Sequence, residues 1–168
     1  MKRILSILAG AVALAAGGLL AAGFLRSPDM TFQASMDIAR PASAVFDVVS
    51  NLENLPKWSS EITSVEKLSD NPRKYSVKGA SGDPTTVEFL AFEPGRRYVS
   101  RMASPAMGFS GDWDIAVEPR GERASRIRSV AKMRLNNVIY RSMSVLMDGN
   151  KEEEKTLLAL KTYLESRP

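Results

Sequence analysis

The chain has 168 residues, with 23 lysines and arginines against 19 aspartates and glutamates, and it contains neither cysteine nor histidine. It therefore has no disulfide, no thiolate nucleophile, no imidazole base and no Cys/His zinc site. Three of the basic residues lie in the first 26 positions, which hold no acid, so the remainder is nearly neutral and lacks the basic surface of a nucleic-acid-binding protein.

Residues 4–25 form an apolar run in which Ser6 is the only clearly polar side chain. As a helix this run would span about 33 Å, which matches the roughly 30 Å hydrocarbon core of a bilayer. The run predicts an uncleaved membrane anchor. The alternative is a cleaved secretory signal, which Lys2, Arg3 and the small residues 21–23 would suit, although signal cores are usually only about 7–15 residues long.

Both interpretations give the same orientation. The positive charges before the apolar run place the amino terminus in the cytoplasm. Residues 1–26 are then the anchor, and residues 27–168 form one domain outside the cytoplasm. We expect a single-pass inner-membrane protein with a periplasmic domain or, after signal cleavage, a secreted periplasmic protein.

The first part of the domain predicts one strand and two short helices. Residues 30–38 alternate apolar and polar side chains, as in a half-buried strand. Pro41 favours a helix start, and apolar residues follow at helical spacing over residues 42–49. A second short helix or turn is expected around Trp58, after the interruption by Pro56.

Between residues 62 and 135 the apolar period changes to two, and Pro, Gly and Asp residues interrupt it at intervals, which predicts about six antiparallel strands. The two clearest apolar faces are Phe109, Gly111, Trp113, Ile115 and Val117, and Ile127, Ser129, Ala131, Met133 and Leu135. The opposite faces carry the acids Asp112, Asp114 and Glu118 and the bases Arg126, Arg128, Lys132 and Arg134. We expect these acids and bases to pair with each other on the solvent side, in preference to acid–base catalysis or lipid headgroup binding.

Residues 137–166 carry apolar side chains at mostly helical spacing, which predicts one long terminal helix with Gly149 as a candidate kink. Within it, residues 152–154 are successive glutamates, and one of them faces inward unless the helix is exposed there. Surface solvation is the favoured interpretation. The order of elements predicts an α+β fold in which one curved antiparallel sheet packs on the long helix.

Four segments resemble the polyketide cyclase/START/Bet v 1-like (SRPBCC) superfamily. They are Met36-Asp-Ile-Ala-Arg-Pro-Ala-Ser-Ala-Val-Phe46, Val48-Val-Ser-Asn-Leu52, Leu55-Pro-Lys-Trp58 and Gly108-Phe-Ser-Gly-Asp-Trp113. Together with the terminal helix, the resemblance covers roughly residues 30–165. It implies a helix-grip fold, in which a seven-stranded antiparallel sheet wraps the terminal helix and encloses an apolar cavity. The superfamily mostly binds or carries lipids, sterols, quinones or polyketides, and a minority are cyclases or dehydratases without a shared catalytic motif.

This implied cavity gives the candidate binding residues. An ordinary filled core is the competing interpretation of the same apolar side chains. One helix does not fill a strongly curved sheet, however, and methionine adapts to ligands of irregular shape. The predicted lining is Trp58, Tyr75, Phe89, Tyr98, Met102, Trp113, Ile115, Ile127, Ser129, Met133, Met143 and Met147.

The leading hypothesis is non-catalytic binding or transport of a hydrophobic small molecule or lipid by a membrane-tethered domain. We expect no catalytic residue, no metal, no cofactor and no nucleic-acid partner, with membrane contact through residues 4–25. The first alternative is a cyclase- or dehydratase-like enzyme working in the same cavity, which a buried Glu88, Arg101 or Glu153 would favour. The second is a structural or interaction module without a ligand.

Overall fold

The computed structural model describes residues 2–80 and 82–166, and side chains from residue 10 onward. The helical elements are α1 (Lys2–Leu25), α2 (Ala42–Val49), η1 (Leu52–Asn54), α3 (Leu55–Trp58), α4 (Val138–Met143), η2 (Ser144–Leu146) and α5 (Gly149–Glu165). The strands are β1 (Asp29–Ile38), β2 (Ile62–Asp70), β3 (Arg73–Gly79), β4 (Pro84–Glu93), β5 (Arg97–Ser104), β6 (Phe109–Pro119) and β7 (Ser125–Leu135). The predicted first strand, two short helices and six later strands are all present.

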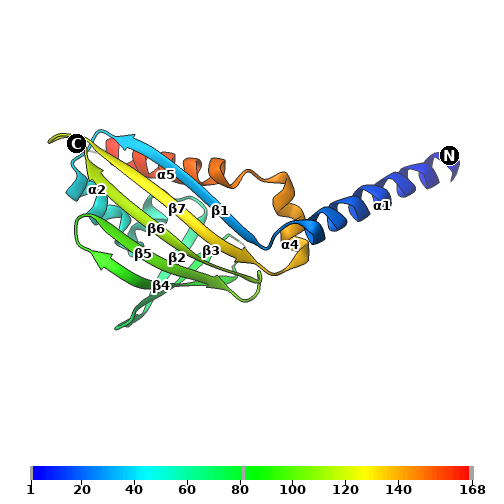
Figure 1. The fold of residues 1–168 in the computed structure, drawn as a ribbon, viewed down its shortest axis with the longest axis horizontal. Helices are drawn as coiled ribbons and strands as arrows, with labels where there is room; N and C mark the ends of the chain where they lie inside the picture. The colour runs from blue at the N-terminus through cyan, green and yellow to red at the C-terminus, as the bar shows by residue number, and fades with distance from the viewer. Residues whose placement is uncertain (1, 81, 167–168) are drawn as a thin grey trace.

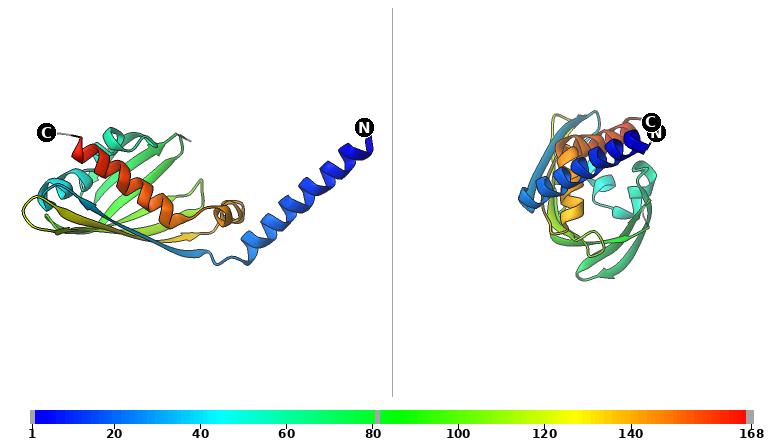
Figure 2. Two further views of the ribbon diagram at one scale, coloured as in Figure 1. Left: turned by 90° about the horizontal axis from the view of Figure 1, so that it is seen from above. Right: turned by 90° about the vertical axis from the view of Figure 1, so that its right-hand side faces the viewer.

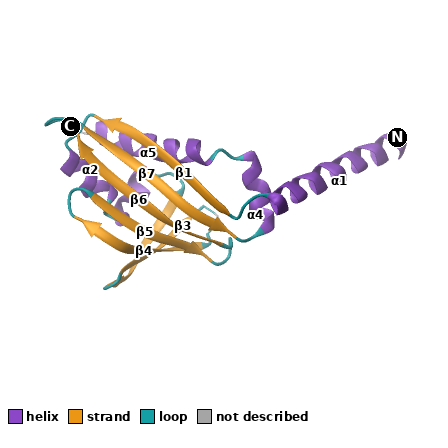
Figure 3. Ribbon diagram, viewed as in Figure 1, coloured by secondary structure: helices purple, strands orange, loops and turns teal. Residues whose placement is uncertain are grey.

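The strands form one antiparallel sheet of seven in the order β1-β7-β6-β5-β4-β3-β2. Strands β2 to β7 therefore follow one another as a meander, and β1 closes the sheet beside β7. The sheet curves strongly, and α5 lies across its concave side while α2 and α3 close one end (Figures 1, 2 and 3). This arrangement confirms the α+β fold with a curved seven-stranded sheet around a carboxy-terminal helix.

The core lies between the concave face and the helices. Leu157, Leu160 and Leu164, on one face of α5, are buried in the same cluster as inward-facing side chains of β6 and β7. Ile115 and Ile127 are among these, as the period-two pattern predicts. Each buried aliphatic side chain of this size stabilises the fold by roughly 1.5–3 kcal/mol relative to exposure.

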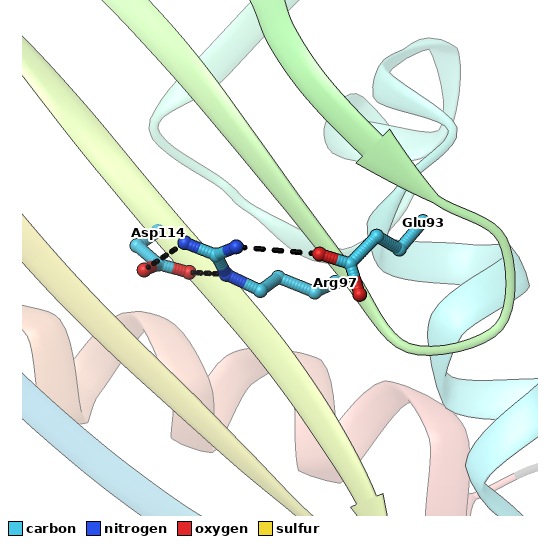
Figure 4. A network of polar contacts seen from close by, with 3 residues as sticks. All are labelled: Glu93, Arg97 and Asp114. Atoms are coloured by element: carbon cyan, nitrogen blue, oxygen red, sulfur yellow. Dashed lines mark hydrogen bonds and ion pairs between the residues drawn. The ribbon is translucent and has the colours of Figure 1, made fainter.

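The convex face carries cross-strand ion pairs. Arg101 Nε lies 2.8 Å from Asp112 Oδ1, and Arg97 Nε lies 2.8 Å from Asp114 Oδ1. Arg97 also reaches Glu93, with Nη1 3.3 Å from Oε1, so one guanidinium joins two carboxylates (Figure 4). Opposite charges do pair on this face, but the expected pairing of the β6 acids with the β7 bases is wrong.

The partners differ because β7 lies between two acidic neighbours. Arg126 pairs with Asp37 of β1, with Nη2 2.6 Å from Oδ2, and Arg134 pairs with Asp29 at 3.1 Å. These residues are direct partners in the β1–β7 register. Arg126 and Arg134 of β7 therefore pair with β1, and Asp112 and Asp114 of β6 pair with the arginines of β5.

The single long terminal helix is a wrong prediction. The chain leaves helical geometry after η2, and Met147 and Asp148 adopt extended backbone angles before α5 begins. The Asp148 carboxylate accepts hydrogen bonds from the backbone N–H groups of Asn150 and Lys151, at 3.1 and 3.4 Å. Asp148 thus starts a new helix.

Helix α1 extends away from the sheet and meets the rest of the molecule at α4 (Figures 1 and 2). Arg141 Nε donates to the Gly23 carbonyl at 2.6 Å, and Arg26 Nη1 donates to the Ser144 carbonyl at 2.6 Å. Over the part of the chain that the structure describes, no helix has the length and apolar character needed to cross a membrane, and the anchor predicted for residues 4–25 is not supported.

Candidate ligand-binding cavity

Two adjoining pockets lie between the concave face of the sheet and α5. The first, which we call the α3 lobe, has a volume of about 640 Å³. The second, the α4 lobe, has a volume of about 450 Å³. Met107, Phe109 and Trp113 line both lobes and form their common wall. Pockets of about 300–1,000 Å³ are the usual size for small-molecule sites.

The α3 lobe is bounded by the short helices and the middle of the sheet. Its lining is Leu52, Leu55, Trp58, Ser59, Ser60, Glu61, Ile62, Val77, Gly79, Ala80, Asp83, Thr85, Val87, Met102 and Thr156, with the common wall. The indole Nε1 of Trp58 is buried and has no hydrogen-bond partner among the described residues.

The α4 lobe is bounded by β1, β7, α4 and the start of α5. Its lining is Met30, Phe32, Met133, Leu135, Tyr140, Met143, Ser144, Met147, Gly149, Glu152 and Glu153, with the common wall. Met143 and Met147 are 52% and 57% exposed, so the outer wall of this lobe faces solvent. Gly149 is required there because a Cβ at this position would collide with the Phe32 ring.

Glu153 brings a carboxylate into the α4 lobe. Its Oε1 accepts a hydrogen bond from Trp113 Nε1 at 3.0 Å, and its Oε2 accepts one from Ser129 Oγ at 2.7 Å. Glu153 lies four residues before Leu157, so it belongs to the same face of α5 as the buried leucines. The favoured interpretation, surface solvation of all three glutamates, is therefore wrong for Glu153.

A buried tyrosine lies in the core near this carboxylate. The hydroxyl of Tyr98 donates to the Val49 carbonyl at 3.2 Å. Burial raises the pKa of Tyr98, and the negative charge of Glu153 raises it further. Tyr98 is thus a neutral hydrogen-bond donor that joins β5 to α2, and it does not supply a base.

The predicted lining residues fall into two groups. Six of them line a lobe: Trp58, Met102, Trp113, Met133, Met143 and Met147. Tyr75, Phe89, Tyr98, Ile115 and Ile127 lie instead in the packed core, and Ser129 holds Glu153. The core group shares inward-facing positions with the lining group, and alternation along a strand does not distinguish contact with a helix from contact with a cavity.

Several lining residues were not predicted. Phe32 and Met30 belong to the inward face of β1, and Met107 lies in the turn before β6. Glu153 is the polar residue of greatest consequence. The sequence signal for its direction is the spacing of positions 153, 157, 160 and 164, which places the glutamate on the apolar stripe of α5.

The lobes offer limited chemistry. No described lysine or arginine lines either lobe. Glu88 and Arg101, considered for an enzymatic site, pair outside the cavity with Lys74 and Asp112, at 3.0 and 2.8 Å. Among the described residues no group of three or more acidic side chains forms a set of metal ligands. The site therefore suits enclosure of an apolar molecule, with the Glu153 carboxylate, held by Trp113 and Ser129, available for a polar contact.

The family model for polyketide cyclase / dehydrase and lipid transport matches residues 29–165. A comparison with curated proteins gives no match. The segment that the family model matches covers the sheet, the short helices and α5, and so includes both lobes.

Solved structures share the fold at low sequence identity. The Zhui aromatase/cyclase from Streptomyces sp. R1128 has a TM-score of 0.69 at 12% identity, over 83% of this chain and 95% of that one. Norcoclaurine synthase from Thalictrum flavum, in complex with dopamine and hydroxybenzaldehyde, has a TM-score of 0.61 at 14% sequence identity, over 83% of this chain and 89% of that one. An uncharacterised protein from Bacillus thuringiensis has a TM-score of 0.65 at 15% sequence identity, over 80% of this chain and 98% of that one. These similarities establish the helix-grip fold that the four sequence segments implied.

Proposed function

Because the chain belongs to the polyketide cyclase/dehydrase and lipid transport family, we propose that it binds a hydrophobic small molecule or lipid between the sheet and α5. The observation that carries this proposal is the pair of adjoining lobes behind a common wall of Met107, Phe109 and Trp113. A filled core would leave no such volume, so the interpretation as a structural module without a ligand is disfavoured.

The lining explains why an apolar ligand would enter. Transfer of apolar surface from water contributes roughly 25 cal/mol per Å², so a ligand burying about 300 Å² would gain on the order of 7 kcal/mol before the costs of immobilisation. The methionines at both ends, Met102 in the α3 lobe and Met143 in the α4 lobe, adapt to ligands of irregular shape.

Binding without chemistry is the preferred form of the proposal. Glu61, Asp83 and Glu152 line the lobes but are exposed, while the less exposed Glu153 carboxylate is held by two neutral donors. Cyclase- or dehydratase-like chemistry is the second candidate, because Glu153 is a potential proton acceptor in a largely apolar pocket and an aromatase/cyclase shares the fold.

The location of the domain outside the cytoplasm, and its tethering, stay predictions from residues 1–26. One structural relationship indicates which lobe such a tether would lie beside. Helix α4, which forms a wall of the α4 lobe, contacts the end of α1 through Arg141 and Gly23. A tether at α1 would therefore hold this lobe at the membrane-proximal end, where a poorly soluble ligand is concentrated.

Organic extraction of the purified full-length chain, followed by mass spectrometry, tests the binding proposal. A hydrophobic molecule recovered in near-stoichiometric amount from the wild type, and depleted in the cavity-filled Met133→Trp variant, is the expected result. An empty chain that also fails to take up added lipids, quinones or fluorescent fatty acids would reject it. Membrane fractionation and amino-terminal sequencing of the chain test the anchor against signal cleavage.

A further inference from the structure

Helix α5 carries an unusual residue at the start of its buried stripe. Leu157, Leu160 and Leu164 are 4%, 0% and 6% exposed, and they face the sheet. The preceding position on that face is Glu153, which lines the α4 lobe. An apolar residue would continue the stripe, so the carboxylate at this point has no role in core packing.

The partners of this carboxylate are neutral. Trp113 Nε1 and Ser129 Oγ each donate one hydrogen bond, and no described lysine or arginine forms an ion pair with it. Its neighbour Glu152 differs, because it faces outward enough to pair with Lys155 at 3.6 Å. Glu153 is thus a carboxylate without a counter-charge, held in fixed position by β6 and β7.

Hydrogen-bonding capacity remains on this carboxylate. An ionised carboxylate offers about four acceptor sites, and two donors occupy two of them. Most of the remaining wall is apolar, including Phe32, Met133 and Met147. Glu153 is partly exposed in the open lobe, so an apolar ligand that fills the lobe would exclude solvent from the carboxylate at a cost, and a ligand group that donates hydrogen bonds relieves this cost.

We infer that Glu153 recognises the head group of the ligand, and that the ligand is an amphiphile ending in a hydroxyl or an amine. This inference rests on the proposed binding function. The apolar part of the ligand occupies the lobes, while its donor group binds the free acceptor sites of the carboxylate. Amphiphiles ending in a carboxylate are rejected, because two like charges would meet in a largely apolar pocket.

Three probes with the same twelve-carbon chain test the inference on the full-length protein at pH 8. Dodecylamine, dodecanol and dodecanoate are used to displace a neutral naphthyl fluorophore. The wild type should bind the amine and the alcohol at least about tenfold more tightly than the carboxylate. A much higher affinity for dodecylamine than for dodecanol indicates recognition by charge. Equal affinities for the two indicate recognition by hydrogen bonding. Both results support a donor head group.

Variants assign the selectivity to Glu153. Glu153→Gln keeps the shape but removes the charge, and Glu153→Leu continues the apolar stripe. Both should reduce the preference to within about twofold, while Glu154→Gln, at an exposed position of the same helix, should keep it. The use of two Glu153 variants guards against one that folds poorly.

The outcomes separate this inference from the function on which it depends. Equal binding of all three probes by the wild type, or an unchanged preference in both Glu153 variants, overturns the inference and leaves hydrophobic binding intact. Failure of the wild type to bind any of the probes or the fluorophore overturns both.

Discussion

Trp113 Nε1 donates a hydrogen bond to Glu153 Oε1 at 3.0 Å, and this contact joins the middle of β6 to the first turns of α5. The indole ring belongs to the common wall of the two lobes, so the same side chain shapes the cavity and positions its carboxylate. The contact therefore contributes to fold stability and to the site at once.

Replacement of Trp113 by Phe should show the energy of this contact. The variant loses the indole donor, and a hydrogen bond to a charged group contributes about 1.5–3 kcal/mol. We expect the free energy of unfolding, measured by urea denaturation, to fall by that amount in addition to the effect of the smaller ring.

Trp58→Phe is the matched control. It makes the same change of ring, but the Trp58 Nε1 has no partner among the described residues, so no hydrogen bond is lost. Trp113→Phe should therefore be more destabilising than Trp58→Phe by about 1.5–3 kcal/mol. Equal losses for the two variants would mean that the Trp113–Glu153 contact contributes nothing in solution.

Gly23 should be essential for docking of α1 on α4. A Cβ there would lie 2.6 Å from the Ser142 backbone nitrogen, which a real side chain does not tolerate. Gly23→Ala should separate the helices and break the hydrogen bonds of Arg26 and Arg141, each contributing about 1 kcal/mol. Tryptic cleavage after these arginines should then accelerate roughly tenfold or more.

Gly18→Ala tests whether this effect is specific. A Cβ at Gly18 meets nothing within 4 Å, and Ala is the better helix former, so cleavage should not accelerate. Similar cleavage rates for the two alanine variants would show that α1 and α4 do not pack closely.

Stability should decrease in acid because of the ion pairs on the convex face. Hydrogen bonding to Arg97 lowers the pKa of Asp114, and hydrogen bonding to Arg126 lowers the pKa of Asp37. A depressed native pKa stabilises the fold above the unfolded-state value of about 4, and this contribution is lost as the pH falls from there through the native pKa. The urea midpoint of the wild type should therefore drop below about pH 4.

Asp114→Asn should flatten this pH dependence, while Asp47→Asn, at an exposed position of α2, should leave it unchanged. The measurement is a set of urea titrations of the three proteins between neutral pH and about pH 2.5, which brackets the unfolded-state pKa of aspartate. If the wild-type and Asp114→Asn curves stay parallel throughout, the Arg97–Asp114 pair does not contribute.

Strand alternation could be predicted from the sequence because it is a local property. The inward positions of β6, such as Ile115, and the outward positions, such as Asp112, follow from a period of two. The partners of the charges could not be predicted, because they depend on strand order. Arg126 lies between Asp37 of β1 and Glu118 of β6 in the sheet register, and only the structure shows that it binds Asp37.

The terminal segment shows a second limit. Apolar residues at helical spacing lie on both sides of the polar stretch 148–156, and no proline interrupts it, so periodicity alone favours one helix over the whole segment. The informative signal was Asp148 before Gly149 and Asn150, a cap followed by free N–H groups. The cavity itself was implied by resemblance, and its extent depends on how side chains such as Phe32 and Met107 pack, which no local pattern encodes.

The most direct test of hydrophobic binding in the cavity is a fluorescence titration of the full-length chain with a neutral naphthyl probe, with and without filled lobes. Met102→Trp fills the α3 lobe and Met133→Trp the α4 lobe, while Leu68→Trp adds the same ring at an exposed position of β2. We expect saturable binding in the wild type and in Leu68→Trp. The double variant Met102→Trp/Met133→Trp, shown by circular dichroism to be folded, should bind the probe at least about tenfold more weakly. Equal binding by the filled variant and the wild type, or no binding by either, would contradict hydrophobic binding in the cavity.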